Sequence, residues 1–301
     1  MGIINSIPLV LMLTAPILIT AIGGMICERS GVVNIALEGL MAIGALGAAA
    51  AHVLMESPLG HGLSILISIL IAMIASMAFS ALHGVCAINL NSDQTISGVG
   101  INLLADGVTI FVAQILFSAD RTKEFMFGMH AGTGNIYPSA WISIIVLLLV
   151  WYVLYELPYG LHLRACGEHP ESAESAGINV RKIRWSAVLI SGALAGLAGA
   201  CCVLTQSTQF TNNLINGKGY IALAAVAFGR WKPLGVFLAS LLFGLAQTFA
   251  LIAVNIGALS SIPSEVFNII PYAVTLIALI CFSGKNYAPA ASGKPFTVSG
   301  S

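Results

Sequence analysis

The sequence predicts an all-helical protein that crosses a membrane several times. The 301-residue chain is 58% hydrophobic and only 8% charged, against roughly 25% charged residues in an average soluble domain. Its apolar residues form runs of about 20, the length that an α-helix needs to cross a bilayer. One soluble core cannot bury so much apolar surface, so membrane lipid is the expected solvent. We therefore expect a single transmembrane domain over residues 1–301.

We expect about eight to ten transmembrane helices, some of them broken or re-entrant. The N-terminus lacks the basic stretch of a signal peptide, so the first apolar segment is expected to remain as a span. The seventh segment is too short to cross alone and the second is polar at its start, so these two are the candidates for broken helices. The nine apolar segments are 7–27, 33–55, 63–88, 96–117, 139–156, 184–205, 219–229, 234–254 and 267–283.

The distribution of lysine and arginine predicts the orientation. If the loop at 157–183 is cytoplasmic, alternation of the spans places nine basic residues inside and three outside. Cytoplasmic loops carry an excess of basic residues, so this loop and the tail at 284–301 are expected in the cytoplasm. The N-terminus would then be outside, unless one re-entrant segment reverses it. The longest external loop, 118–138, is either a plain connection or a docking surface for an external partner.

The segment 164–184 is unlike the rest of the chain. It carries seven charged side chains, although the whole chain has only 12 basic and 12 acidic residues. Pro170 suits the first position of a helix, and Gly177 is placed to end it. A helix of two turns is not stable alone. We expect either an ordinary cytoplasmic loop or a helix whose small face, formed by Ala173 and Ala176, docks on another protein.

A polar stripe runs along the fourth apolar segment. Asn102, Asp106 and Thr109 follow the i, i+4, i+7 spacing that places residues on one helix face. A charge at the centre of a transmembrane helix costs on the order of 2.5–3.5 kcal/mol, so this face should look at other helices or at a water-filled path. Interhelical hydrogen bonding and a translocation pathway are the two explanations. Further pathway candidates are Asn34, Glu38 and Gln247. For Asn34 and Glu38 the alternative is that they brace a helix break.

Two segments of the chain resemble each other weakly. Ile35–Gly44 and Ile221–Gly229 share a small apolar pattern, and each follows a charged break that contains glycine. Paired interrupted helices in the two halves of a transporter point to a central binding site. Chance similarity between apolar strings is the alternative explanation.

Five stretches spread over nearly the whole chain carry a family pattern: 23–45, 94–105, 164–178, 217–235 and 288–295. The most specific are GGMICERSGVVNIALEGLMAIGA, which begins at Gly23, and RACGEHPESAESAGI, which begins at Arg164. With them the chain resembles ABC-importer permeases of the branched-chain amino acid/simple-sugar type, and within these the nucleoside branch. His169 stands where the family pattern has asparagine, and Asp106 is a charge where an uncharged residue is usual.

The resemblance implies a permease subunit that passes a nucleoside-like solute across the bacterial cytoplasmic (inner) membrane. A second permease subunit, identical or related, would pair with it. ABC ATPase subunits would hold ATP and Mg, and an extracytoplasmic lipoprotein would bind the substrate. The segment 164–184 would contain the coupling helix. The residues expected to couple to the ATPase are Gly167, Glu168, Pro170, Glu171, Ala173, Glu174, Ala176 and Gly177.

The chain itself is not expected to be an enzyme. It has no G-x-x-x-x-G-K-[ST] motif, so it is expected to hold no catalytic residue and no cofactor. Its cysteines form no C-x-x-C pair, so no metal site is expected, and its net charge of zero implies no nucleic-acid partner. The alternatives are the same machinery importing riboflavin or a simple sugar, or an ATP-independent secondary transporter or channel.

Overall fold

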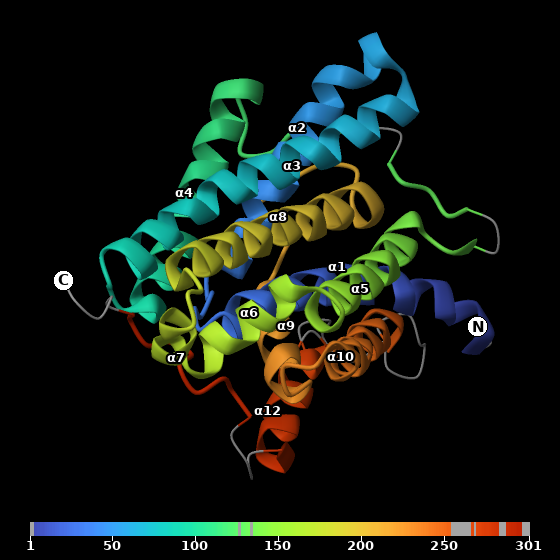
Figure 1. Ribbon diagram of the computed structural model, residues 1–301. Helices are drawn as coiled ribbons and strands as arrows, with labels where there is room; N and C mark the ends of the chain where they lie inside the picture. Colours follow the sequence, from blue (N-terminus) through green and yellow to red (C-terminus); the bar gives the residue numbers. More distant parts are fainter. Residues whose placement is uncertain are drawn as a thin grey trace.

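The computed structural model describes residues 3–125, 128–132, 135–253, 266–267, 269–282 and 287–296. Within these ranges the regular secondary structure is helical, with no strand (Figure 1). In chain order the helices are α1 (Ile3–Arg29), α2 (Leu37–Leu59), α3 (His61–Gly84), the π-helical turn η1 (Val85–Asn89), α4 (Gln94–Phe117), α5 (Pro138–Tyr155), α6 (Pro158–Glu168), α7 (Pro170–Ser175), α8 (Val180–Gln206), α9 (Lys218–Phe228), α10 (Pro233–Ala253) and α12 (Ile270–Phe282).

Seven helices of the described chain are long and apolar enough to cross a membrane: α1, α2, α3 with η1, α4, α5, α8 and α10. They match the first six and the eighth of the predicted segments, which confirms an all-helical polytopic membrane protein. The seventh segment is α9, with 11 residues. At 1.5 Å per residue α9 reaches about 16 Å, roughly half of a 30 Å hydrocarbon core. The ninth segment contains α12.

Helices α1, α2 and α8 form the interior of the bundle. In the most apolar stretch of α1 and of α8, 83% of the residues are buried, whereas the share is 22% in α3 and 28% in α4. Figure 1 shows α8 running between α3 and α1. Close packing requires glycine here, because a Cβ added to Gly44 of α2 would lie 2.4 Å from the Cα of Gly196 in α8. The outer helices expose large apolar side chains such as Leu70, Phe111 and Leu148, which suits contact with lipid.

Basic residues gather at the end of the bundle that the C-terminal tail crosses, where the Arg184 guanidinium donates to the Lys294 backbone oxygen at 3.1 Å. The guanidinium of Arg29, at the end of α1, donates to the backbone oxygen of Trp231 at 2.9 and 2.7 Å. The Gly293 N–H donates to the Gly31 oxygen, and the Ala291 N–H donates to the Gly167 oxygen. The tail thus crosses both the end of α1 and the end of α6.

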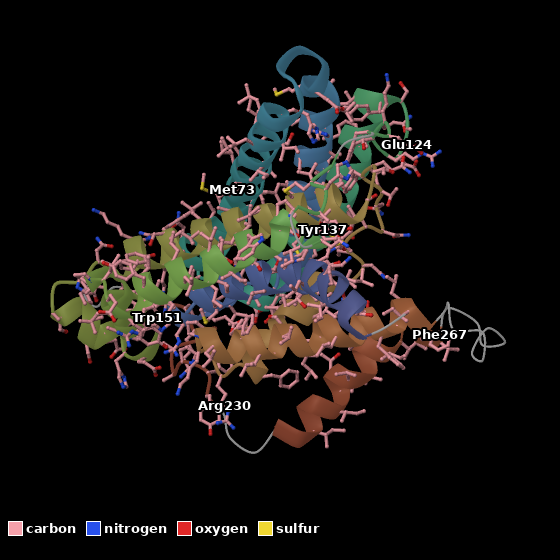
Figure 2. All side chains as sticks on the ribbon, turned by 90° about the vertical axis from the view of Figure 1, so that its right-hand side faces the viewer. Met73, Glu124, Tyr137, Trp151, Arg230 and Phe267 are labelled. Atoms are coloured by element: carbon pink, nitrogen blue, oxygen red, sulfur yellow. The ribbon has the colours of Figure 1, made fainter. Side chains whose placement is uncertain are left out.

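The opposite end carries the loop after α4. In Figure 2, Glu124 of this loop and Trp151 in the last turns of α5 lie on opposite sides of the molecule. Backbone N–H groups of Thr122 and Phe125 donate to the oxygens of Phe210 and Thr208. The loop is therefore held against the chain that follows α8.

Candidate functional site

The first helix break separates α1 from α2. Asn34 is fully buried there, and its Oδ1 accepts the Ala36 N–H at 3.1 Å while its Nδ2 donates to Ser191 Oγ at 2.9 Å. The Val33 N–H donates to Oε1 of Gln94 at 2.7 Å. Buried backbone outside a helix must find hydrogen-bond partners within the protein, and these side chains supply them. The structure therefore places Asn34 as a brace of the break.

The second break precedes α9, and Glu38 of α2 closes it. The Glu38 carboxylate accepts the Gly217 N–H at 2.7 Å and the Gly219 N–H at 2.6 Å. A carboxylate is favoured at a helix N-terminus, where N–H groups lack partners within the helix. A Cβ on Gly219 would lie 2.5 Å from the Glu38 nitrogen. The two similar segments of the sequence thus begin at breaks that contact each other.

Asn102 of α4 joins both breaks. Its Nδ2 donates to the Ile35 oxygen at 2.9 Å and to the Tyr220 hydroxyl at 3.0 Å, and its Oδ1 accepts the Gly39 N–H at 2.9 Å. These bonds use both amide donors and the amide acceptor of the buried side chain. For this residue of the polar stripe, the structure favours interhelical hydrogen bonding.

The other two residues of the stripe differ from Asn102. Thr109 is buried and donates to the Asp106 backbone oxygen, one turn earlier in its own helix, at 3.0 Å. The Asp106 side chain is exposed. Within the described ranges, its carboxylate forms no hydrogen bond or ion pair. Tyr220 is 47% exposed, although its hydroxyl accepts a hydrogen bond from Asn102. A carboxylate halfway along a membrane helix, as at Asp106 in α4, requires water or another protein surface, because lipid solvates a charge poorly.

Gln247 lies in a separate cavity among α1, α8, α9, α10 and α12. The cavity has a volume of about 340 Å³. Gln206 donates to the Met12 oxygen at 3.1 Å and Tyr272 to the Asn216 oxygen at 3.0 Å. The polar residues that line the cavity are Gln206, Asn216, Lys218, Gln247 and Tyr272.

The predicted pathway residues therefore do not form one site. Three of them brace the helix breaks, two lie farther along α4, and Gln247 lines the cavity. The predicted pathway set lacks the tyrosines at 220 and 272 as well as Lys218. Lys218 and Tyr220 lie in or beside the broken stretch at 217–219, which is a sequence signal because a broken helix exposes polar groups that need partners. Tyr272 is distant in sequence and only the packing of α12 brings its hydroxyl to the Asn216 oxygen.

The short helix α7 of the charged segment begins and ends at the residues that the sequence predicted. Pro170 occupies the first turn of α7, and Gly177 has φ +84°. The Gly177 N–H donates to the Glu174 oxygen at 2.8 Å, and the Ile178 N–H donates to the Ala173 oxygen at 3.0 Å. These two bonds are the Schellman arrangement that ends a helix at glycine.

The predicted small face of α7 needs a correction. Ala173 is only 4% exposed and packs in a cluster with Cys166 and Val180, because a two-turn helix needs apolar contact with its own chain to be stable. Gly167 is also buried, and a Cβ there would lie 2.2 Å from the Arg29 oxygen. Of the predicted coupling residues, Pro170 and Glu174 are half-buried, and the exposed ones are Glu168, Glu171, Ala176 and Gly177.

The comparison with known families decides the class of this protein. The pattern of the family described as "Branched-chain amino acid transport system / permease component" matches residues 6–279. The chain belongs to this permease family. The family resemblance noted in the sequence is thereby confirmed, and the helix breaks and the charged segment are parts of a membrane permease.

Three relatives of the permease are informative. It is 39% identical to the guanosine ABC transporter permease protein NupQ of Bacillus subtilis (strain 168), over 96% of this chain and 95% of the relative. It is 35% identical to the nucleoside ABC transporter permease protein NupC of Lactococcus lactis subsp. cremoris (strain MG1363), over 97% of this chain and 98% of the relative. It is 32% identical to the putative glucose ABC transporter permease protein TsgC13 of Haloferax volcanii, over 78% of this chain and 73% of the relative.

Proposed function

We propose that this chain is the transmembrane subunit of an ABC importer that carries a nucleoside-like solute across the bacterial cytoplasmic membrane. The similarity to two permeases named for guanosine and nucleosides, over nearly the whole chain, carries the proposal. The exposed groups of the broken-helix region suit such a solute. The Tyr220 and Tyr272 rings are 47% and 41% exposed and offer surfaces on which a heterocycle stacks. The Asp106 carboxylate accepts hydrogen bonds from sugar hydroxyls.

A second permease subunit, identical or related, would cover this exposed polar surface. Asp106 and Tyr220 face outward from a single chain, so pairing of two subunits would place them beside a shared path and away from lipid. An extracytoplasmic lipoprotein would deliver the solute to the end that carries the loop after α4. The chain would bind no cofactor, and ATP and Mg would reside in the ATPase subunits.

The charged segment would transmit motion from the ATPase. The end that contains Arg29, Arg184 and Lys294 would be cytoplasmic, in line with the excess of basic residues in cytoplasmic loops. The exposed side of α7 would contact an ATPase subunit. Its inner side is packed against α8 through Val180, and Gly167 lies against the end of α1. A displacement of α7 together with the adjoining end of α6 would therefore move α8 and α1, two of the three interior helices, as shear of packed helices does in other switches.

Uptake of labelled solutes tests the proposal. Cells that express the chain with its partner subunits should accumulate guanosine. This uptake should stop when the P-loop lysine of the ATPase partner is replaced. Uptake of guanosine that continues without ATPase activity would favour a secondary transporter or channel. Uptake of glucose or riboflavin in place of guanosine would favour the alternative solutes, of which glucose has support from the Haloferax volcanii relative.

A further inference from the structure

The hairpin between α2 and α3 brings together two histidines and a glutamate. His52 and Glu56 lie four residues apart on α2, on one helix face. His61 is the first residue of α3, directly after Gly60, whose φ of +75° turns the chain back. The ligand atoms of the three side chains all lie within 4.8 Å of one another. We propose that this cluster binds a divalent transition-metal ion, with zinc as the best fit.

The types of ligand select the metal. Two imidazoles and one carboxylate form a common donor set for zinc, whereas calcium and magnesium prefer oxygen ligands throughout. Zinc bonds of about 2.0–2.2 Å place the ligand atoms of a tetrahedral site roughly 3.5 Å apart. Nδ1 of His61 already lies 3.9 Å from Oε1 of Glu56. The His61 and Glu56 side chains are 42% and 26% exposed, so both have room to rotate toward a shared ion.

The surroundings of His52 orient its ring for a metal. Its Nδ1 lies 2.8 Å from Ser64 Oγ, and the Ser64 hydroxyl donates to the His52 backbone oxygen at 3.5 Å. A serine hydroxyl has one proton. With that proton directed at the His52 backbone oxygen, Ser64 Oγ accepts from Nδ1–H and the ring presents the lone pair of Nε2. Metal-binding histidines commonly donate their other ring N–H to a fixed acceptor in this way. His52 is fully buried, so the ion would approach from the exposed side of His61 and Glu56.

The site would link the hairpin to the external loop. The His52 ring meets the Phe125 ring edge-on, with centroids 5.1 Å apart and planes at 89°. Phe125 is hydrogen-bonded through its backbone N–H to Thr208 at 2.8 Å. Three protein ligands leave a fourth position for water or for a group from a partner. A bound ion would thus fix the end of α2, the start of α3 and the loop after α4 in one arrangement.

Metal binding to the purified full chain tests the proposal. The affinity tag must contain no histidine, and competition with a chromophoric chelator gives the stoichiometry and the dissociation constant for zinc. We expect about one zinc ion per chain. His61→Ala and Glu56→Gln should each weaken binding by at least about 10-fold. These two residues are better targets than His52, whose buried ring also contributes to packing. His130→Ala is the matched control, because His130 is exposed in the loop after α4 and lies outside the cluster.

Two further measurements separate a built site from adventitious binding. Ser64→Ala should weaken zinc binding roughly 10- to 100-fold, as loss of a group that orients a ligand does. Cobalt in place of zinc should give the intense visible absorption of tetrahedral coordination in the unmodified chain and in His130→Ala, but not in His61→Ala. The proposal is overturned if the unmodified chain binds no zinc, or if His61→Ala and Glu56→Gln bind it as tightly as the unmodified chain.

Discussion

The Glu38 carboxylate accepts the backbone N–H of Gly219 at 2.6 Å, across 181 residues of sequence. The carboxylate also accepts the Gly217 N–H, so one side chain of α2 caps the start of α9. Both helices begin after a break. The contact therefore fixes the two interrupted segments to each other.

Loss of the Glu38 carboxylate should destabilise the protein. Glu38→Ala leaves two N–H groups without their acceptor, and a hydrogen bond to a charged group contributes about 1.5–3 kcal/mol. We expect a lower midpoint of thermal unfolding in detergent and lower uptake. Glu38→Gln keeps one acceptor oxygen, so its unfolding midpoint should lie between those of Glu38→Ala and the unmodified chain. Equal unfolding midpoints for Glu38→Ala and the unmodified chain would contradict the capping role.

Asp106 and Asn102 should respond differently to replacement. Asp106→Asn changes an exposed carboxylate, so we expect normal accumulation in the membrane and altered uptake or solute preference. Asn102→Ala removes three hydrogen bonds at buried positions and should lower stability by a few kcal/mol, since an unmade buried bond costs about 1–3 kcal/mol. Immunoblots of membranes and uptake rates distinguish the two. Failure of Asp106→Asn to accumulate would make Asp106 a structural residue.

The two alanines of the coupling segment should have separate effects. Ala176 is exposed, so Ala176→Trp should disturb contact with the ATPase and reduce uptake while ATP hydrolysis continues and the fold is retained. Ala173 is buried, so Ala173→Leu should overpack its cluster and destabilise the chain by about 1–3 kcal/mol. The ratio of transport to ATP hydrolysis, with the unfolding midpoint as control, checks both. Unchanged uptake in Ala176→Trp would remove that residue from the coupling surface.

A cysteine at position 172 should be labelled only from the cytoplasm. Ser172 is exposed on α7, so a membrane-impermeant maleimide should react with Ser172→Cys in inverted vesicles and not in intact cells. The neighbouring native thiol is a weak competitor, because burial raises the pKa of Cys166 and only the thiolate reacts. The unmodified chain measures the background from native cysteines. Labelling from outside would reverse the proposed orientation.

Several features of this protein were predictable from local sequence. Apolar runs fixed the spans because a helix must bury its backbone polar groups within itself to cross lipid. Pro170 and Gly177 marked the ends of α7 because their backbone preferences act within one helical turn. The short apolar run at 219–229 indicated a helix too short to cross. All of these depend on neighbours in sequence.

The tertiary structure decided which side chains meet. Spacing placed Asn102 and Asp106 on one face of α4, but only packing showed that Asn102 is enclosed by α2 and α9 whereas Asp106 is exposed. Ala173 is buried because its short helix packs against α8, and the Glu38 carboxylate accepts hydrogen bonds from Gly217 and Gly219. Helical periodicity determines the face that a residue occupies, and the arrangement of the other helices determines what that face contacts.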